Sequence, residues 1–297
     1  MKKSLAMMTA AMMVAGALAG CGSSGSTPAA TTAEATTAAA TEAATTEVAT
    51  TEAGDTAAAA EGTVKTPSGK FTVGFDQEFP PMGFVGDDGQ FTGFDLDLAK
   101  EVASRLGLEF VPQPINWDAK DMELDSGNID CIWNGFTMQG REDAYTWVGP
   151  YMANNQVFVV TADSDIASKA DLAGKAVEVQ KDSSGLAALQ GDAELSASFG
   201  SMTEVADYNT ALMDLESGAC DAVCMDSIVA GYQIKSSGKD MKILDDTLSA
   251  EEYGIGFKKG EDELAKAVYD TLMEMKDDGT VAKISNDWFG SDVCALK

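Results

Sequence analysis

Histidine is absent from this 297-residue chain, and arginine occurs only twice, as Arg105 and Arg141. Without histidine, zinc sites of the usual Cys/His type are excluded, and none of the five cysteines has a C-x-x-C spacing. We therefore expect no metal and no cofactor. A disulfide between Cys220 and Cys224 remains open, although the apolar runs around Cys131 and Cys224 favour buried thiols.

The missing histidine also bears on catalysis. Enzymes that move protons need a positioned acid or base, and the sequence shows no nucleophile paired with a base. We therefore predict that the protein is not an enzyme. Acidic residues such as Glu78 keep a catalytic alternative open.

Basic residues are scarce in the whole chain. Twenty lysines and arginines stand against 48 acidic residues, which gives a formal net charge of −28. Such a chain would be repelled by phosphates, so DNA, RNA and anionic lipid surfaces are excluded as partners. A local basic group can still bind an anion inside an acidic surface.

The N-terminus has the pattern of a secretory signal peptide over residues 1–20. Lys2 and Lys3 precede an apolar run, Leu5–Leu18, which is short for a membrane span. The run ends in Leu-Ala-Gly-Cys, which resembles a bacterial lipobox with Cys21 as the lipidated residue, typically carrying palmitate. We expect a lipoprotein anchored on the outer side of the plasma membrane. A plain signal peptide with an incidental cysteine is the alternative.

Residues 21–66 consist mainly of Ala, Thr and Glu and contain no aromatic residue. Such a segment cannot bury enough apolar surface to offset the entropy lost on ordering. We predict a disordered tether between the lipid anchor and the folded part.

An alternation of strand and helix patterns begins at Lys70–Phe75, which reads as a strand. Gly93-Phe94-Asp95 then opens a helix with Asp95 as its expected N-cap, and Gly107 ends it. Leu98, Val102 and Leu106 form its apolar face. Further alternation predicts an α/β fold.

An internal repeat relates residues 122–134 to residues 213–225. Each copy reads as a helix end, a Ser-Gly stop and a buried strand, and chance similarity is the alternative. Ligands of open α/β sheets bind beyond the carboxyl ends of the strands. We expect Asn134–Thr137 and Met225–Ser227 to face each other across a cleft.

Candidate groups for an anion follow these strands. Arg141 carries a guanidinium that suits a carboxylate, although an ion pair with Glu142 or Asp143 is the alternative. Arg105 reads as a solvated charge on a helix. Ser183 and Ser184 start another helix, where hydroxyls and free N–H groups bind anions or simply cap the helix.

Candidate groups for the rest of a ligand are acidic and aromatic. Asp226 ends a buried strand and is the candidate for an ammonium group, and Asp76 ends the first strand and suits a polar side chain. Phe79 and Trp117 could stack on the ligand, although core packing is the alternative reading of Trp117.

The run Gly93–Ala103 resembles the signature of the family 3 extracellular solute-binding proteins, the polar amino-acid receptors of ABC importers. The resemblance extends from about Thr66 to Gly290. The matching segments are Gly74–Pro81, Trp133–Thr137, Pro150–Met152, Ser183–Gly185, Ala222–Asp226, Tyr253–Phe257 and Trp288–Gly290.

The resemblance implies an α/β periplasmic-binding-protein fold of type II. Two lobes, each a mixed and mostly parallel sheet flanked by helices, would be joined by two hinge strands near Tyr151–Asn155 and Ser249–Tyr253. Residues 67–150 and 254–297 would form lobe 1, and residues 151–253 would form lobe 2.

The resemblance also assigns roles. Arg141, Thr137 and Ser183 or Ser184 would bind the α-carboxylate of an amino acid, and Asp226 with the Gly135 carbonyl would bind its ammonium. Phe79 and Trp117 would enclose the side chain, and its polar end would be read by Asp76, Asn134 and Gln180.

A polar amino acid would thus be captured by hinge closure and delivered by a monomeric protein to an ABC permease and its ATPase. A ligand-sensing receptor subunit is the alternative. The segment Thr137–Arg141 is one residue shorter than the commoner family spacing, so the reach of Arg141 depends on the structure.

Overall fold

The computed structural model describes Thr66 and residues 68–297. The predicted signal peptide, the lipidation site Cys21 and nearly all of the predicted tether lie outside the described residues. No helix among the described residues combines the length and apolarity needed to span a bilayer.

Eleven strands are present in the described part of the chain. They are β1 (Lys70–Phe75), β2 (Glu78–Phe79), β3 (Gly83–Val85), β4 (Phe91–Thr92), β5 (Glu109–Pro114), β6 (Cys131–Thr137), β7 (Tyr145–Thr161), β8 (Ala176–Gln180), β9 (Ser201–Val205), β10 (Ala222–Asp226) and β11 (Met241–Lys258).

Helices alternate with these strands, as the sequence predicted. They are α1 (Phe94–Leu106), α2 (Lys120–Asp125), α3 (Ser184–Gly191), α4 (Ala193–Ser198), α5 (Tyr208–Ser217), α6 (Ser227–Ser237), α7 (Asp262–Asp277) and α8 (Thr280–Phe289), with short 3-10 helices η1 (Trp117–Ala119) and η2 (Lys169–Leu172).

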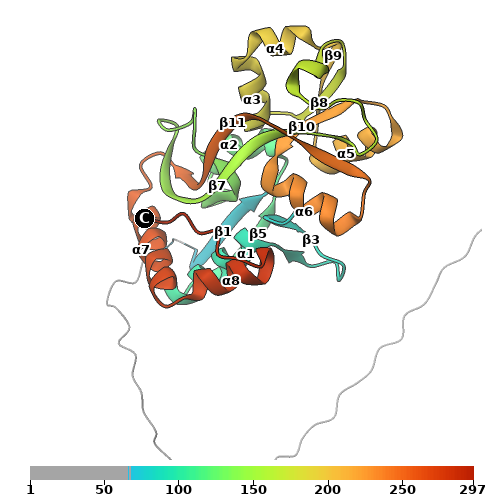
Figure 1. The fold of residues 1–297 in the computed structure, drawn as a ribbon. Coiled ribbons are helices and arrows are strands. Elements are labelled where there is room, and N and C mark those ends of the chain that lie inside the picture. The colour runs from blue at the N-terminus through green and yellow to red at the C-terminus, as the bar shows by residue number, and fades with distance from the viewer. Residues whose placement is uncertain (1–65, 67) are drawn as a thin grey trace, which may run out of the picture. The chain divides into compact units, whose positions relative to one another are not determined.

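The main sheet has eight strands in the order β5-β1-β6-β11-β7-β10-β8-β9. Three parallel strands lie at each end, and the long strands β7 and β11 pair antiparallel between them. The two parallel groups are therefore joined through β7 and β11 into one hydrogen-bonded ladder (Figure 1). A separate small sheet contains β2, β3 and β4.

The repeat seen in the sequence corresponds to equivalent units at the two ends of the sheet. In the first, α2 leads into β6, and in the second, α5 leads into β10. Both strands are buried throughout, because each is covered by helices and lies beside other strands. Because ligands of such sheets bind beyond the carboxyl ends of the strands, the ends of β6 and β10 can contribute to one site.

Helix α1 departs from the prediction at its start. Gly93, not Asp95, is the N-cap, and Asp95 lies in the first turn with a fully buried side chain. The prediction of a capping Asp95 is therefore wrong, because its carboxylate faces inward to Gly135 instead of the helix end. Gly107 ends α1 in the left-handed conformation, as predicted.

The chain returns to the first group of strands after β11. Helices α7 and α8 pack against α1, and Cys294 forms a bridge to Met152 of β7. Arg105 lies in the last turn of α1, where it forms ion pairs with Glu101 and Asp278. It is thus a paired surface charge rather than a purely solvated one.

Candidate binding site

A narrow cavity lies where β6, β8 and β10 end. Its nine lining residues are all among those singled out from the sequence: Phe79, Trp117, Gly135, Thr137, Arg141, Gln180, Ser183, Ser184 and Asp226. The structure therefore brings together residues up to 147 positions apart in the chain. Asp76 and Asn134, the other two candidates, lie beside this cavity and contact its wall.

Gly135 in β6 shapes one wall by its backbone. Its φ of 57° lies in the left-handed region, and an added Cβ would meet Phe79 at 2.9 Å. Its N–H donates to Asp95 Oδ2 at 2.7 Å, and the Tyr151 hydroxyl donates to the same oxygen at 2.8 Å. Burial raises the pKa of Asp95 to about 7.

Helix α3 begins at the cavity. Ser183 is its N-cap and accepts a hydrogen bond from the Leu186 N–H at 3.1 Å, so the capping reading of this serine is confirmed. Ser184 follows in the first turn, and its hydroxyl lies 3.1 Å from that of Thr137 in β6. Residues from both ends of the sheet therefore meet at this helix start.

Arg141 reaches the cavity from the β6–β7 loop. Its Nη1 donates to the Thr137 carbonyl at 3.2 Å, and its Nη2 donates to the Asp182 carbonyl at 3.4 Å. Within the described chain it forms no ion pair, with Glu142 and Asp143 included. The short loop thus still delivers a guanidinium without a carboxylate partner to the cavity.

Asp226 ends β10 and is almost completely buried, with 3% of its surface exposed. It accepts hydrogen bonds from Asn154 Nδ2 at 2.6 Å, from the Tyr253 hydroxyl at 2.6 Å and from the Tyr208 hydroxyl at 3.0 Å. Burial, with the nearby charge of Glu251 as the second cause, raises its pKa to about 7. No ion pair of the described residues includes this carboxylate.

Glu251 is a residue that the sequence reasoning missed. It lies in β11, is 5% exposed, and its Oε1 accepts from Thr137 at 2.9 Å, Asn154 at 2.7 Å and Gln156 at 2.8 Å. The sequence offered only an acidic pair, Glu251-Glu252, in an expected hinge strand. Burial of one member depends on the neighbouring strand and could not be read from that pattern.

Asp76 and Gln180 meet at the other end of the cavity. Gln180 Nε2 donates to Asp76 Oδ2 at 2.7 Å, and the Asp76 N–H donates to Asn134 Oδ1 at 3.0 Å. Burial raises the pKa of Asp76 to about 6. The Asn134 side chain therefore holds the Asp76 backbone and does not line the cavity.

A wider cleft continues from Asp76 and shares Trp117 with the cavity. Its lining holds one cation, Lys181, and six carboxylates: Asp76, Glu78, Asp118, Glu123, Glu204 and Asp207. The site thus has a cationic group at the Arg141 end and a strongly acidic approach at the Asp76 end.

The two aromatic candidates, Phe79 and Trp117, line the cavity, and each packs against a different aromatic ring. The Phe79 ring lies 5.7 Å from that of Tyr208, and the Trp117 ring meets Phe136 edge-on at 5.5 Å. Lys120 Nζ lies 5.1 Å from the centre of the Trp117 ring. Trp117 is therefore packed on one side and lines the cavity on the other.

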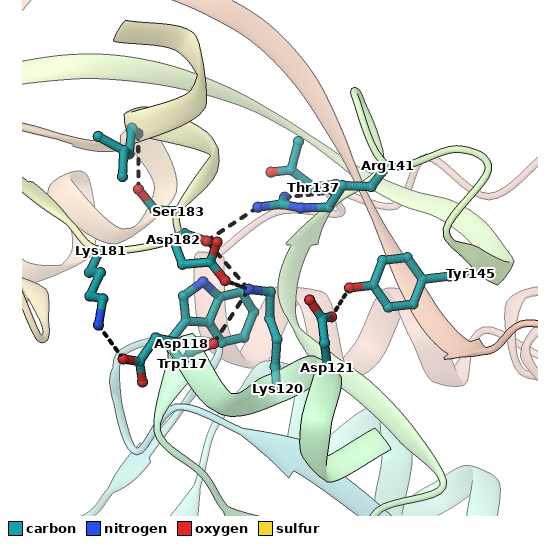
Figure 2. Close-up of polar contacts among 11 residues, drawn as sticks. Trp117, Asp118, Lys120, Asp121, Thr137, Arg141, Tyr145, Lys181, Asp182 and Ser183 are labelled. Atoms are coloured by element: carbon teal, nitrogen blue, oxygen red, sulfur yellow. Dashed lines mark hydrogen bonds and ion pairs between the residues drawn. The ribbon is translucent and has the colours of Figure 1, made fainter. Parts of the chain in front are cut away.

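Two ion pairs connect the η1–α2 segment to the β8–α3 loop beside the cavity (Figure 2). Lys120 of α2 pairs with Asp182 in the β8–α3 loop, and Lys181 of the same loop pairs with Asp118 of η1 at 2.6 Å. We call these two pairs the mouth pairs. They differ in burial, because the Lys120 side chain is 2% exposed and the Lys181 side chain 56% exposed.

No cluster of three or more potential ligating residues for a metal ion occurs in the part of the chain that the structure describes. Cys131, Cys220, Cys224 and Cys294 are free thiols, so the disulfide left open between Cys220 and Cys224 is not formed.

Comparison with known proteins agrees with this arrangement. The family model "Bacterial extracellular solute-binding proteins, family 3" matches residues 71–291. The L-cystine-binding protein TcyJ of Escherichia coli (strain K12) is 32% identical, with 76% of this chain and 84% of the relative covered. The histidine-binding periplasmic protein of Salmonella typhimurium is 30% identical over 75% of this chain and 89% of that protein.

Among solved structures, an ABC uptake transporter substrate-binding protein from Streptococcus pneumoniae with bound histidine has a TM-score of 0.75 and 34% identity. The similarity covers 77% of this chain and 96% of that protein. The fold is thus that of the type II periplasmic binding proteins, as expected. This chain belongs to the family 3 bacterial extracellular solute-binding proteins.

Proposed function

We propose that this protein captures a polar amino acid between two lobes and delivers it to an ABC importer. One observation carries the proposal. Arg141, without a carboxylate partner in the described chain, and Asp226, without a cationic one, line the same cavity. Buried charges require partners of opposite sign, and a zwitterion supplies one for each.

Each end of such a ligand has suitable groups. Arg141 and the start of α3 would bind the α-carboxylate, with the hydroxyls of Thr137 and Ser183 or Ser184 assisting. Asp226 and the Gly135 carbonyl would bind the ammonium. Phe79 and Trp117 would then enclose the side chain, and its polar end would meet Asp76 and Gln180.

Capture would proceed by hinge closure between lobe 1, residues 67–150 and 254–297, and lobe 2, residues 151–253. Contacts between these segments support this, since Gln180 bonds to Asp76 and Ser184 lies against Thr137. The paired segments Tyr151–Asn155 and Ser249–Tyr253 would act as the hinge. Closure requires that the ligand make more contacts in the closed state than in the open one.

The acidic approach favours a side chain that is cationic or carries an amino group. Six carboxylates, Asp76 among them, line this cleft, against one lysine. Relatives named for binding cystine and histidine are consistent with a polar ligand.

Similarity to a substrate-binding protein of an ABC uptake transporter supports delivery to a permease and its ATPase. The protein would act as a monomer, anchored outside the plasma membrane through lipid on Cys21. Mass spectrometry of the protein from membranes would detect a lipidated Cys21. A sensory role would be favoured if no permease and ATPase genes lay beside its gene.

A thermal-shift screen of the common amino acids and cystine tests the ligand class. A ligand that binds only the native state raises stability by about 2.7 kcal/mol at a concentration one hundred times its Kd. We expect shifts for a few polar amino acids and none for aliphatic ones. No shift with any amino acid would contradict the proposal.

Arg141→Ala and Asp226→Ala test the residue roles. Loss of one partner of a buried charge pair costs about 2–5 kcal/mol, against about −8 kcal/mol for micromolar binding. Calorimetry should therefore detect little or no binding in either variant. Arg105→Ala is the matched control, because Arg105 pairs on the surface with Glu101 and Asp278. Intact binding in both site variants would refute the assignment.

A further inference from the structure

Two buried carboxylates lie side by side behind the cavity. Asn154 Nδ2 donates to Asp226 Oδ1 at 2.6 Å and to Glu251 Oε1 at 2.7 Å, so a single amide group bridges them. Asp226 is 3% exposed and Glu251 is 5% exposed. Neither takes part in an ion pair of the described residues.

Two neighbouring carboxylates in a region of low dielectric cannot both ionise easily, because desolvation and mutual repulsion favour the neutral acid. A proton on Asp226 relieves both effects. Asp226 Oδ1 accepts hydrogen bonds from Asn154 and Tyr253, and Oδ2 accepts one from Tyr208, so Oδ2 is the less engaged oxygen; the Gln156 amide also interacts with this carboxylate.

The other titratable groups around Asp226 do not compete for this role. Tyr208 of α5 and Tyr253 of β11 donate to it, and burial raises their pKa values well above the usual range. Burial likewise raises the pKa of the Cys224 thiol in β10. Arg141 faces the same cavity from the β6–β7 loop. The partners of Glu251 on β6, β7 and α3 are neutral.

We propose that Asp226 carries a proton in the ligand-free protein because the buried Glu251 lies beside it, and that the ammonium group of a bound ligand displaces this proton into solvent. Glu251 does not line the cavity and acts through Asp226, so it is a positioning residue. The exchange balances in charge, since one cation enters as one proton leaves to the buffer. The ligand step rests on the proposed function.

The pair itself can be tested without a ligand. Carbon-13 NMR of labelled aspartate carboxyls, assigned with Asp226→Asn, should show Asp226 titrating near pH 7, in keeping with its pKa of about 7. Glu251→Gln removes the neighbouring charge and keeps an oxygen acceptor, so the titration should move down by about one pH unit or more. Glu252→Gln is the control, because it removes the same charge from the adjacent residue of β11, which is not among the hydrogen-bond partners of Asp226 in the described chain.

Two NMR results would contradict the proposal. Titration of Asp226 near its ordinary value in the wild type would overturn the proposal, as would an equal effect of the two glutamine variants. Circular dichroism first checks that both variants fold. If Glu251→Gln does not fold, the wild-type titration still decides.

Calorimetry with L-arginine, L-histidine and L-cystine tests the exchange. For a probe that binds, Kd should rise about tenfold for each unit that pH is lowered below the titration point, because the proton competes with the ammonium. The heat at pH 6 should depend on the ionisation enthalpy of the buffer. Glu251→Gln should flatten this profile, whereas Glu252→Gln should not. Asp76 also titrates in this range but is present in both variants, so its effect cancels.

Binding of a probe at pH 6 without proton release would overturn the exchange and leave the proposed function intact. Failure of all three probes, together with a negative thermal-shift screen, would instead contradict the proposed function. The ligand-free titration would then still decide whether Asp226 carries a proton.

Discussion

Asp95 shows how one side chain can be assigned to the wrong task from sequence. Aspartate before an apolar helix is typical of an N-cap, but here the helix starts two residues earlier, with Gly93 as its cap. The buried carboxylate instead accepts hydrogen bonds from the Gly135 N–H and the Tyr151 hydroxyl. Asp95 thus holds the backbone of a residue that lines the cavity.

Asp95→Ala should destabilise the protein by about 2–4 kcal/mol, because it leaves the buried Tyr151 hydroxyl without its acceptor and the Gly135 N–H with only its longer bond to that hydroxyl. Chemical denaturation would measure this loss. Asp87→Ala, which removes an exposed aspartate in the β3–β4 turn, is the control and should change stability by less than about 0.5 kcal/mol. Similar stabilities of the two variants would contradict this role of Asp95.

At the scale of elements, the η1–α2 segment and the β8–α3 loop meet at the mouth pairs. Asp182 adopts a φ of 56°, which turns its carbonyl toward both Lys120 and Arg141. The buried Lys120 also lies over the Trp117 ring. Lys120 therefore links the cavity wall at Trp117 to the loop that begins α3, whereas Lys181 and Asp118 meet in solvent.

Lys120→Met should weaken ligand binding about tenfold, mainly through faster dissociation, because it removes a desolvated cation that bridges the two segments. Lys181→Met is the matched control and should change affinity less than about threefold, since exposed ion pairs contribute about 0–1 kcal/mol. Stopped-flow measurements of dissociation would compare them. Equal effects would show that burial does not distinguish the mouth pairs.

At the scale of the whole molecule, three buried aspartates link stability to pH. Burial raises the pKa values of Asp76 to about 6 and of Asp95 and Asp226 to about 7. The folded state therefore binds more protons than the unfolded chain between about pH 4 and pH 7, where unfolded aspartates are already ionised. Stability should fall as pH rises through this window. Repulsion within a chain of net charge −28 also lowers stability as pH rises.

Ligand-free protein should therefore melt several degrees higher at pH 5 than at pH 8, at about 2–4 °C per kcal/mol for a domain of this size. Calorimetric melting at both values would measure the difference. Asp95→Asn should reduce it, because the amide does not titrate. A melting temperature that rises from pH 5 to pH 8 would contradict the expected linkage.

The strand-and-helix alternation and the candidate cavity could both be predicted from local patterns. The internal repeat indicated that β6 and β10 are equivalent, and ligand sites in such sheets follow strand ends. Nine of the residues singled out, either from these patterns or from what the family resemblance implies, line one cavity. Glu251, Asn154 and Gln156 could not be found this way, because their burial arises from the pairing of β7 with β11 and from contact with α3.

The sequence by itself determined the class of fold, the family and the types of charged group available, because periodicity, glycine positions and the scarcity of arginine are properties of the linear chain. Only the tertiary structure decided which charges are buried and unpaired. Burial and distance depend on segments far apart in sequence. Only the folded chain therefore places Asp226 and Glu251 next to each other, where Asn154 bridges them and the charge of one affects the other.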